Sequence, residues 1–129
     1  MTQENCVRAY KALEKLMVQN LTLPMAVKVF NMHRDLQKAW DFQLSEERKI
    51  IERHPNVDPV TATVKYEPDD EKTMDERLAE LDSFVTELGE LGHMEQEIEI
   101  HPFSLVADEE IIKIAGTDIR DLQGFVSFI

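Results

Sequence analysis

Four histidines and many carboxylates make metal binding the first chemistry to consider in this chain. Structural and catalytic zinc sites use closely spaced His and Cys ligands, and calcium loops use alternating acids around a central glycine. The sequence has no His-Glu-x-x-His motif, one cysteine and no calcium-loop pattern. The histidines occur singly, as His33, His54, His93 and His101. We therefore predict no metal site and no cofactor.

The densest group of candidate ligands is an alternating run of acids that ends in a histidine. Glu95, Glu97, Glu99 and His101 lie two residues apart. In an extended chain their side chains share one side, with roughly 7 Å between neighbours. That spacing is too wide for several of them to hold one ion without a second strand. The pattern favours a solvated acidic face over a metal site.

Nucleophilic and phosphate-binding chemistry has equally little support. Ser45, Ser104 and Ser127 do not lie in a glycine-bracketed nucleophile elbow. The four glycines never cluster after a strand pattern, so no phosphate-binding loop is predicted. The 26 acidic residues offer acid–base pairs, but so many acids are also typical of a soluble acidic surface. We predict that the protein is not an enzyme, with a small metal-dependent enzyme as the least favoured alternative.

The negative charge is concentrated in the second part of the chain. Residues 1–54 hold nine Lys and Arg against seven Asp and Glu, whereas residues 55–129 hold five against nineteen. The net charges of these parts, +2 and −14, make up the total of −12. Because binding to phosphates needs a basic face, we expect no direct contact with nucleic acid. The acidic part instead favours a protein partner with a basic surface.

The single cysteine and the hydropathy of the chain indicate the cellular compartment of the protein. Cys6 is the single cysteine and has no partner for an intramolecular disulfide, which is compatible with a reducing environment. No apolar run approaches the roughly 20 residues that span a bilayer, and no basic leader is visible. The sequence thus predicts a cytoplasmic protein without membrane contact.

Hydrophobic periodicity predicts the elements that position these side chains. Apolar residues recur every three or four positions over residues 2–19 and again over about 24–53, where Pro24 suits a first helical turn. These two helices form a near-neutral hairpin whose second helix is long. Beyond residue 54 the patterns predict, in order, a strand over 60–66, a helix from a Thr73 cap to Gly89 or Gly92, a strand over 95–100 and a weak helix over 118–128.

The predicted fold class is α+β. We expect a single, mainly helical domain over residues 1–129, in which residues 1–54 form the helical hairpin. Residues 55–129 form an acidic strand-helix-strand-helix part. Its two strands are expected to pair with each other as a small two-stranded antiparallel sheet.

Two surfaces are candidates for protein binding. The first consists of the acids on the alternating run and in two further acidic runs: Glu95, Glu97, Glu99, Asp69, Asp70, Glu71, Asp108, Glu109 and Glu110. The second lies on the long helix, where Trp40 fits the apolar stripe expected in the core and Phe42, two residues later, cannot share its face. This second set is expected to contact a partner or a second copy, and its members are Trp40, Phe42, Val27 and Met32.

The order of these patterns carries a resemblance. A long helix that starts with Leu-Thr-Leu-Pro-Met-Ala-Val-Lys at residues 21–28 ends with Glu-Glu-Arg-Lys-Ile-Ile-Glu-Arg at residues 46–53. A helix over residues 84–91 then precedes the alternating Glu/Ile run at residues 95–100. Over most of residues 7–125, this order resembles a family of small uncharacterised proteins encoded by phages and prophages of Gram-positive bacteria. The resemblance implies a phage origin and brings no catalytic residues.

These features together predict a non-enzymatic, phage-type accessory protein that works by binding another protein. In one form, its acidic surface occupies the basic groove of a host nucleic-acid enzyme or defence complex. In the alternative form, it is a virion assembly or structural factor that associates through its long helix, as a homodimer or with a virion protein. The competing interpretation is that the acids only keep the protein soluble.

Overall fold

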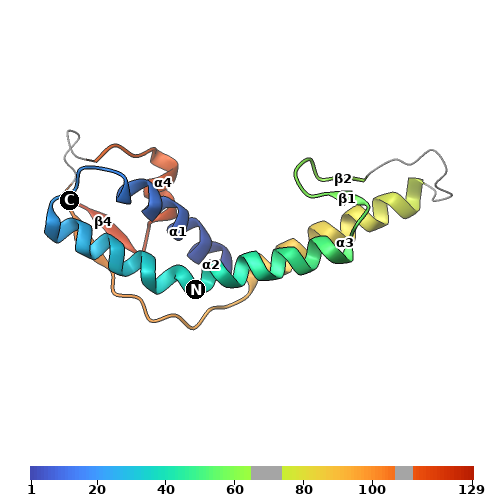
Figure 1. Ribbon diagram of the computed structural model, residues 1–129, viewed down its shortest axis with the longest axis horizontal. Coiled ribbons are helices and arrows are strands. Elements are labelled where there is room, and N and C mark those ends of the chain that lie inside the picture. Colours follow the sequence, from blue (N-terminus) through green and yellow to red (C-terminus); the bar gives the residue numbers. More distant parts are fainter. Residues whose placement is uncertain (65–73, 107–111) are drawn as a thin grey trace.

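The computed structural model describes residues 1–64, 74–106 and 112–129 and is mainly helical (63%). Its elements are α1 (Gln3–Met17), α2 (Leu23–Arg53), β1 (Val57–Asp58), β2 (Thr63–Val64), α3 (Met74–His93), β3 (Phe103–Leu105), α4 (Gly116–Asp121) and β4 (Val126–Phe128). The long helix and the small antiparallel sheet confirm the predicted α+β class. The molecule is elongated, with α2 running along much of its length (Figure 1).

Helix α1 begins where its capping residue predicts. The Thr2 hydroxyl accepts a hydrogen bond from the Asn5 amide at 3.2 Å, which satisfies one of the unpaired N–H groups of the first turn. The predicted apolar stripe is buried at Tyr10, Leu13 and Leu16. Helix α1 thereby packs side by side with α2 in the predicted hairpin (Figure 1).

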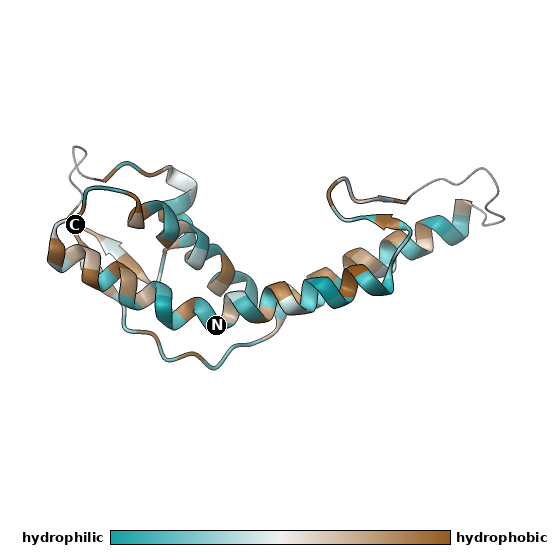
Figure 2. Cartoon of the chain, viewed as in Figure 1, coloured by the Kyte–Doolittle hydropathy of each residue, from teal (hydrophilic) through white to brown (hydrophobic). Residues whose placement is uncertain are grey.

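Helix α2 connects two hydrophobic clusters. Its 31 residues span about 46 Å at 1.5 Å per residue. Val29 and Leu36, in its first half, pack with α1 and the C-terminal elements into the larger cluster. Ile50, in its second half, packs with α3 and β1 into a smaller one, whose other buried members are Val57, Phe84 and Leu91. Hydrophobic residues are interspersed with hydrophilic ones along the whole of α2 (Figure 2).

The predicted strand over residues 60–66 is confirmed only at Thr63–Val64, which form β2; residues 60–62 form a turn, and residues 65–66 lie outside the described residues. Strands β1 and β2 make a short antiparallel hairpin in which Val57 pairs with Val64. The carboxylate of Asp58 accepts hydrogen bonds from the amides of Val60 and Thr61, at 2.9 and 3.3 Å, and so closes a turn. Local turn chemistry at Asp58 and Pro59 therefore prevails over the alternating pattern that follows them.

Helix α3 extends through Gly89 and ends at His93, so the predicted end at Gly89 is wrong and the end at Gly92 is one residue short. A glycine inside a helix costs only about 1 kcal/mol. The contacts of Phe84 and Leu91 with the smaller cluster outweigh that cost. The predicted cap, Thr73, lies outside the described residues.

The alternating segment over residues 95–100 is extended but is not a strand of a sheet. Its β contact within the described part of the chain is a single isolated bridge between Glu95 and Thr2. The predicted pairing with residues 60–66 is therefore wrong. Ile98 and Ile100 instead pack against the larger cluster. The segment is therefore held extended by its contacts with the helical core and not by pairing with another strand.

The predicted C-terminal helix over residues 118–128 is confirmed only at its start. Helix α4 spans Gly116–Asp121, and Gly124, with φ of 87°, turns the chain into β4. Strand β4 pairs in parallel with β3, which places Phe103 opposite Val126. Phe125 and Val126 are buried in the larger cluster, and this burial favours a strand for the last residues.

Candidate functional site

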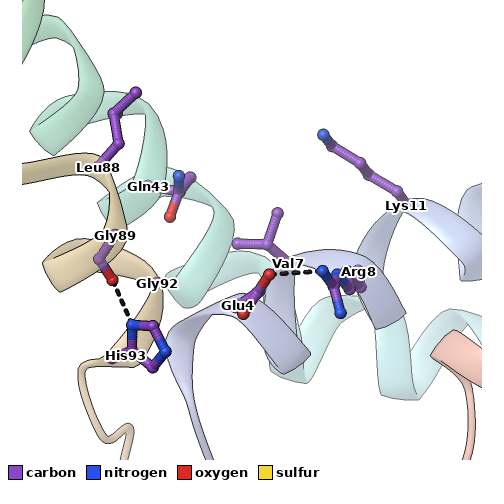
Figure 3. A pocket seen from close by; sticks show the side chains of 9 residues that line it. All are labelled: Glu4, Val7, Arg8, Lys11, Gln43, Leu88, Gly89, Gly92 and His93. Atoms are coloured by element: carbon purple, nitrogen blue, oxygen red, sulfur yellow. Dashed lines mark hydrogen bonds and ion pairs between the residues drawn. The ribbon is translucent and has the colours of Figure 1, made fainter. Parts of the chain in front are cut away.

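A pocket of about 310 Å³ lies where α1, α2 and α3 meet (Figure 3). Glu4 accepts a hydrogen bond from Arg8, and His93 Nδ1 donates one to the Gly89 carbonyl at 2.7 Å. On the same helix face, the Lys11 ammonium lies 5.4 Å from the centre of the Trp40 ring. The charged groups of this pocket are thus engaged with their neighbours, and the geometry favours a structural junction over a ligand site.

The described residues show no grouping for metal chemistry. Among them, no three His, Cys, Asp or Glu side chains lie close enough together to hold an ion. Within the same ranges, no helix has the length and apolar character that crossing a membrane requires. The thiol of Cys6 is fully buried, and this burial raises its pKa. A raised pKa disfavours the reactive thiolate at neutral pH.

A buried glutamine of α1 ties α1 and α2 to the segment that follows α3. The Gln3 amide nitrogen donates to the Ala39 carbonyl at 2.7 Å and to Gln43 Oε1 at 3.1 Å. Its oxygen accepts from the Gln96 side chain at 2.7 Å, and its backbone N–H donates to the Met94 carbonyl at 2.7 Å. Gln3 therefore fixes the point at which the acidic segment, defined here as residues 95–101, begins its path along α2.

The acidic segment presents glutamates to solvent on a fixed backbone. Ile98 and Ile100 anchor it to the larger cluster, and between them Glu97 and Glu99 are exposed. The side chain of Glu99 is 86% exposed and lies 3.8 Å from His101. Glu95 is also exposed, but its carboxylate accepts a hydrogen bond from the Met1 amino group at 2.8 Å. Glu97 and Glu99 are thus exposed, and they alternate with the partly buried Ile98 and Ile100.

The other acids of the predicted surface cannot be placed beside it. Asp69, Asp70 and Glu71 lie in residues 65–73, and Asp108, Glu109 and Glu110 lie in residues 107–111. Both ranges are outside the described residues. The acidic face that the structure supports is therefore the acidic segment alone.

The predicted self-association set is dispersed by the fold. Met32 is 2% exposed and belongs to the larger cluster, so its assignment to an exposed surface is wrong. Trp40 stacks on Tyr10 with ring centres 5.0 Å apart, and Phe42 packs against the smaller cluster. Val27 alone of the four is exposed, at 49%.

An apolar stripe that includes Val27 lies on the first turns of α2. Leu23 is 77% exposed and Phe30 is 51% exposed. The positions i, i+4 and i+7 place these three side chains on one helix face, opposite the buried Val29 and Met32. Sequence reasoning missed Leu23 and Phe30, although their spacing with Val27 marks a second stripe.

Exposed cations border this stripe. Lys28, Arg34 and Lys38 are exposed on the same half of α2. Arg34 makes a long contact of 3.8 Å with Asp35, and within the described ranges Lys28 and Lys38 form no ion pair. We name the exposed face of α2 as the surface formed by Leu23, Val27, Lys28, Phe30, Arg34 and Lys38. It is apolar at its start and carries both signs of charge beyond it, because Asp35 contacts Arg34 and Asp41 is exposed after Lys38.

The acidic segment ends beside this face. A recess of about 400 Å³ lies between α2 and the chain that enters β3, with Lys28 and Arg34 on one side and His101 and Phe103 on the other. Together with the Gln3 contacts near Ala39, this recess shows that the acidic segment runs antiparallel to α2 (Figure 1). Acidic and basic surfaces are therefore neighbours on one flank of the molecule.

The far end of α2 carries a polar contact that joins it to α3. His54 Nε2 and Arg53 lie 3.1 and 3.2 Å from the Glu87 carboxylate. Partial burial acts to raise the pKa of Glu87, but the hydrogen bonds from His54 and Arg53 outweigh it and hold that pKa below its ordinary value. The ring of His54 also meets Phe84 edge-on, at 5.8 Å between ring centres. This arrangement stabilises the smaller cluster.

Neither a protein-family model, nor a curated protein, nor a solved structure matches the chain. The candidate surfaces therefore rest on the geometry of this chain alone.

Proposed function

We propose that the protein acts without catalysis, by binding another protein through the exposed face of α2. The observation that carries this proposal is the stripe of Leu23, Val27 and Phe30, which stays uncovered although the opposite face of the helix is packed at Val29, Met32 and Leu36. Contiguous exposed apolar side chains mark interaction surfaces in soluble proteins. A helix face with anchors at i, i+4 and i+7 is a recurrent way to bind a groove or another helix.

The energetic gain from covering this stripe is sufficient for a specific contact. Full burial of a Leu, Val or Phe side chain contributes about 1.5–3 kcal/mol. Scaled by their exposed fractions, the three side chains would contribute about 3–5 kcal/mol in total. The opposite face of α2 is already packed at Val29 and Leu36. The stripe is therefore held in place before a partner arrives, which lowers the entropic cost of binding.

Photo-crosslinking tests this proposal even while the partner is unidentified. A photo-reactive phenylalanine analogue replaces Phe30, and a matched protein carries the same analogue in place of Val85, which is 52% exposed on α3. We expect protein adducts from position 30 in cells and few from position 85. Equal yields at both positions, or none at position 30, would contradict the proposal.

A second candidate function is supported by the exposure of Glu97 and Glu99 on the anchored acidic segment. Here the segment would occupy a basic groove, such as that of a host nucleic-acid enzyme. Binding of this type weakens steeply with salt. The test compares wild type with a Glu97→Lys, Glu99→Lys double variant for inhibition of a nucleic-acid enzyme at two salt concentrations. Inhibition that persists both in the double variant and at the higher salt concentration would exclude this role.

The resemblance to phage and prophage proteins supplies a setting for both roles. A virion assembly factor would use the helix face, and an inhibitor of a host enzyme would use the acidic segment. In either case the proposal places the protein in the cytoplasm of the host cell, where the free thiol of Cys6 is stable.

A further inference from the structure

We propose that the acidic segment is an open strand edge that binds an extended peptide in which basic and apolar residues alternate. The peptide adds to the segment as a neighbouring strand and pairs with its backbone. The inference goes beyond the binding of a partner to the exposed face of α2, because it concerns residues 95–101 alone. It is carried by the backbone of the segment, which is extended and unpaired over most of its length.

The backbone of residues 97–101 lacks partners in the part of the chain that the structure describes. The Gln96 amide donates to the Met1 carbonyl at 2.8 Å, and beyond the segment the Phe103 amide donates to the Phe125 carbonyl at 3.2 Å. Between these two bonds, no backbone N–H or C=O group is hydrogen-bonded to another described residue. Because a buried unpaired backbone group is costly, these groups face water. They form a row of unused donors and acceptors, which is a template for an added strand.

The segment is held in its extended form before a peptide arrives. Glu95 forms an antiparallel bridge with Thr2, so the chain enters the segment with strand geometry. It leaves the segment into β3, which pairs with β4 (Figure 1). Between these ends, Ile98 and Ile100 pack against the larger cluster. A preformed strand loses less conformational entropy on binding than a flexible loop, which favours pairing with a peptide.

The open edge has the length of an ordinary strand. Residues 97–101 span about 17 Å in an extended chain, and strands of globular proteins are usually about five or six residues long. Pro102 has no N–H group, so the row of donors ends there. A short peptide can therefore pair along the whole of this edge.

The side chains of the segment define the chemistry of the peptide. Residues that lie directly opposite each other in neighbouring strands place their side chains on the same face of the sheet. Basic residues of the peptide would therefore lie opposite the exposed Glu97 and Glu99, and apolar residues opposite Ile98 and Ile100. Like charges placed opposite each other are destabilising, so a second copy of the acidic segment is a poor occupant. The alternation thus selects a basic and apolar peptide.

Peptide binding with a backbone-blocked control tests the inference. The probe is a short capped peptide in which Lys and Val alternate. Its control carries N-methyl groups on the backbone amides, which removes the donors and keeps the charge. Fluorescence anisotropy measures the affinity of each labelled peptide for the full chain. We expect the N-methylated peptide to bind at least roughly tenfold more weakly, because several main-chain hydrogen bonds are lost.

Equal affinities of the two peptides would overturn the inference, because binding would then depend on charge alone. Absence of binding by the unmodified peptide would overturn it as well.

Hydrogen exchange measured by NMR locates the bound peptide. In the free protein, we expect the amides of residues 97–101 to exchange at nearly the rate of an unstructured chain, because they have no partner among the described residues. Saturating peptide should slow some of these amides by at least roughly tenfold. Amides that are already protected in the free protein, or that the peptide leaves unprotected, would overturn the inference. Protection that rises with protein concentration alone would show a second copy as the occupant and would overturn it too.

A pair of protein variants tests the role of the glutamates. Glu97→Lys with Glu99→Lys should weaken binding of the alternating peptide by at least roughly tenfold. The matched control is Asp82→Lys with Glu90→Lys, which makes the same change of charge at exposed positions of α3 and should alter the affinity by less than about threefold. Equal losses in both proteins would overturn the assigned pairing. If the first variant fails to fold by circular dichroism, Glu97→Gln with Glu99→Gln replaces it, with a smaller loss expected.

Failure of the inference and failure of the proposed function are distinguishable. Equal binding of the two peptides would refute strand addition and leave Glu97 and Glu99 as a charged surface for the second candidate function. Crosslinking at position 30 reports on the exposed face of α2 and does not depend on either peptide.

Discussion

Replacement of Gln3 by methionine removes the hydrogen bonds that join α1, α2 and the acidic segment while keeping the side-chain volume similar. The wild-type amide makes three side-chain hydrogen bonds, to Ala39, Gln43 and Gln96, in a fully buried position. Each such bond contributes about 1 kcal/mol net. Gln43 and Gln96 are partly exposed and can turn to water, so we expect a loss of about 2–3 kcal/mol in the free energy of unfolding.

Urea denaturation followed by Trp40 fluorescence and by far-ultraviolet circular dichroism measures this loss. The matched control is Gln123→Met, at an exposed side chain, for which we expect a change within about 0.5 kcal/mol. Hydrogen exchange supplies a second readout, because the Gln96 amide donates to the Met1 carbonyl at 2.8 Å and should exchange faster once the segment is released. A Gln3→Met protein as stable as its control, with unchanged exchange at Gln96, would refute the role of Gln3 as a junction.

Three further predictions concern stability. Phe84→Ala should lower the free energy of unfolding by about 3–5 kcal/mol, because it leaves a cavity in the smaller cluster. Hydrogen exchange should show this loss first in α3. An unchanged midpoint of unfolding in urea would contradict the prediction. Asp118→Ala should lower the free energy of unfolding by about 1–3 kcal/mol, because the nearly buried carboxylate accepts hydrogen bonds from the exposed Lys15, at 2.8 Å, and from the Ala115 amide. Thermal unfolding measures it, with Asp75→Ala at an exposed site as control. The lowered pKa of Glu87 gives a stabilisation that is present above its ordinary value and lost as pH falls through its folded pKa. Unfolding titrations from neutral to acidic pH should therefore show a steeper fall for wild type than for Glu87→Gln, and parallel curves would exclude this contribution.

The helices were predictable from the sequence because their signals are local. Thr2 marks a cap, Pro24 marks a first turn, and the apolar spacing of both helices matches the period of 3.6 residues. The strands were not predictable in the same way. Ile98 and Ile100 alternate with glutamates as in a strand, yet whether they pair with another strand or pack on helices depends on distant residues. The parallel pairing of β3 with β4 likewise depends on contacts between two segments that are separated in the sequence by α4.

The candidate surfaces were predictable only in part, for the same reason. Alternation alone placed Glu97 and Glu99 on the solvent side, and the structure agrees. Met32 and Phe30, however, are two residues apart on α2 and both apolar, so the sequence does not show which one the core will cover. The fold decides this, because Met32 packs in the larger cluster while Phe30 stays exposed.

The central claim is that the exposed face of α2 is an interface, and adduct formation at position 30 tests it most directly. With the photo-reactive analogue at Phe30, we predict protein adducts in cells at several times the yield obtained with the analogue at Val85. Equal yields from the two positions, whose exposed fractions are nearly the same, would contradict the claim.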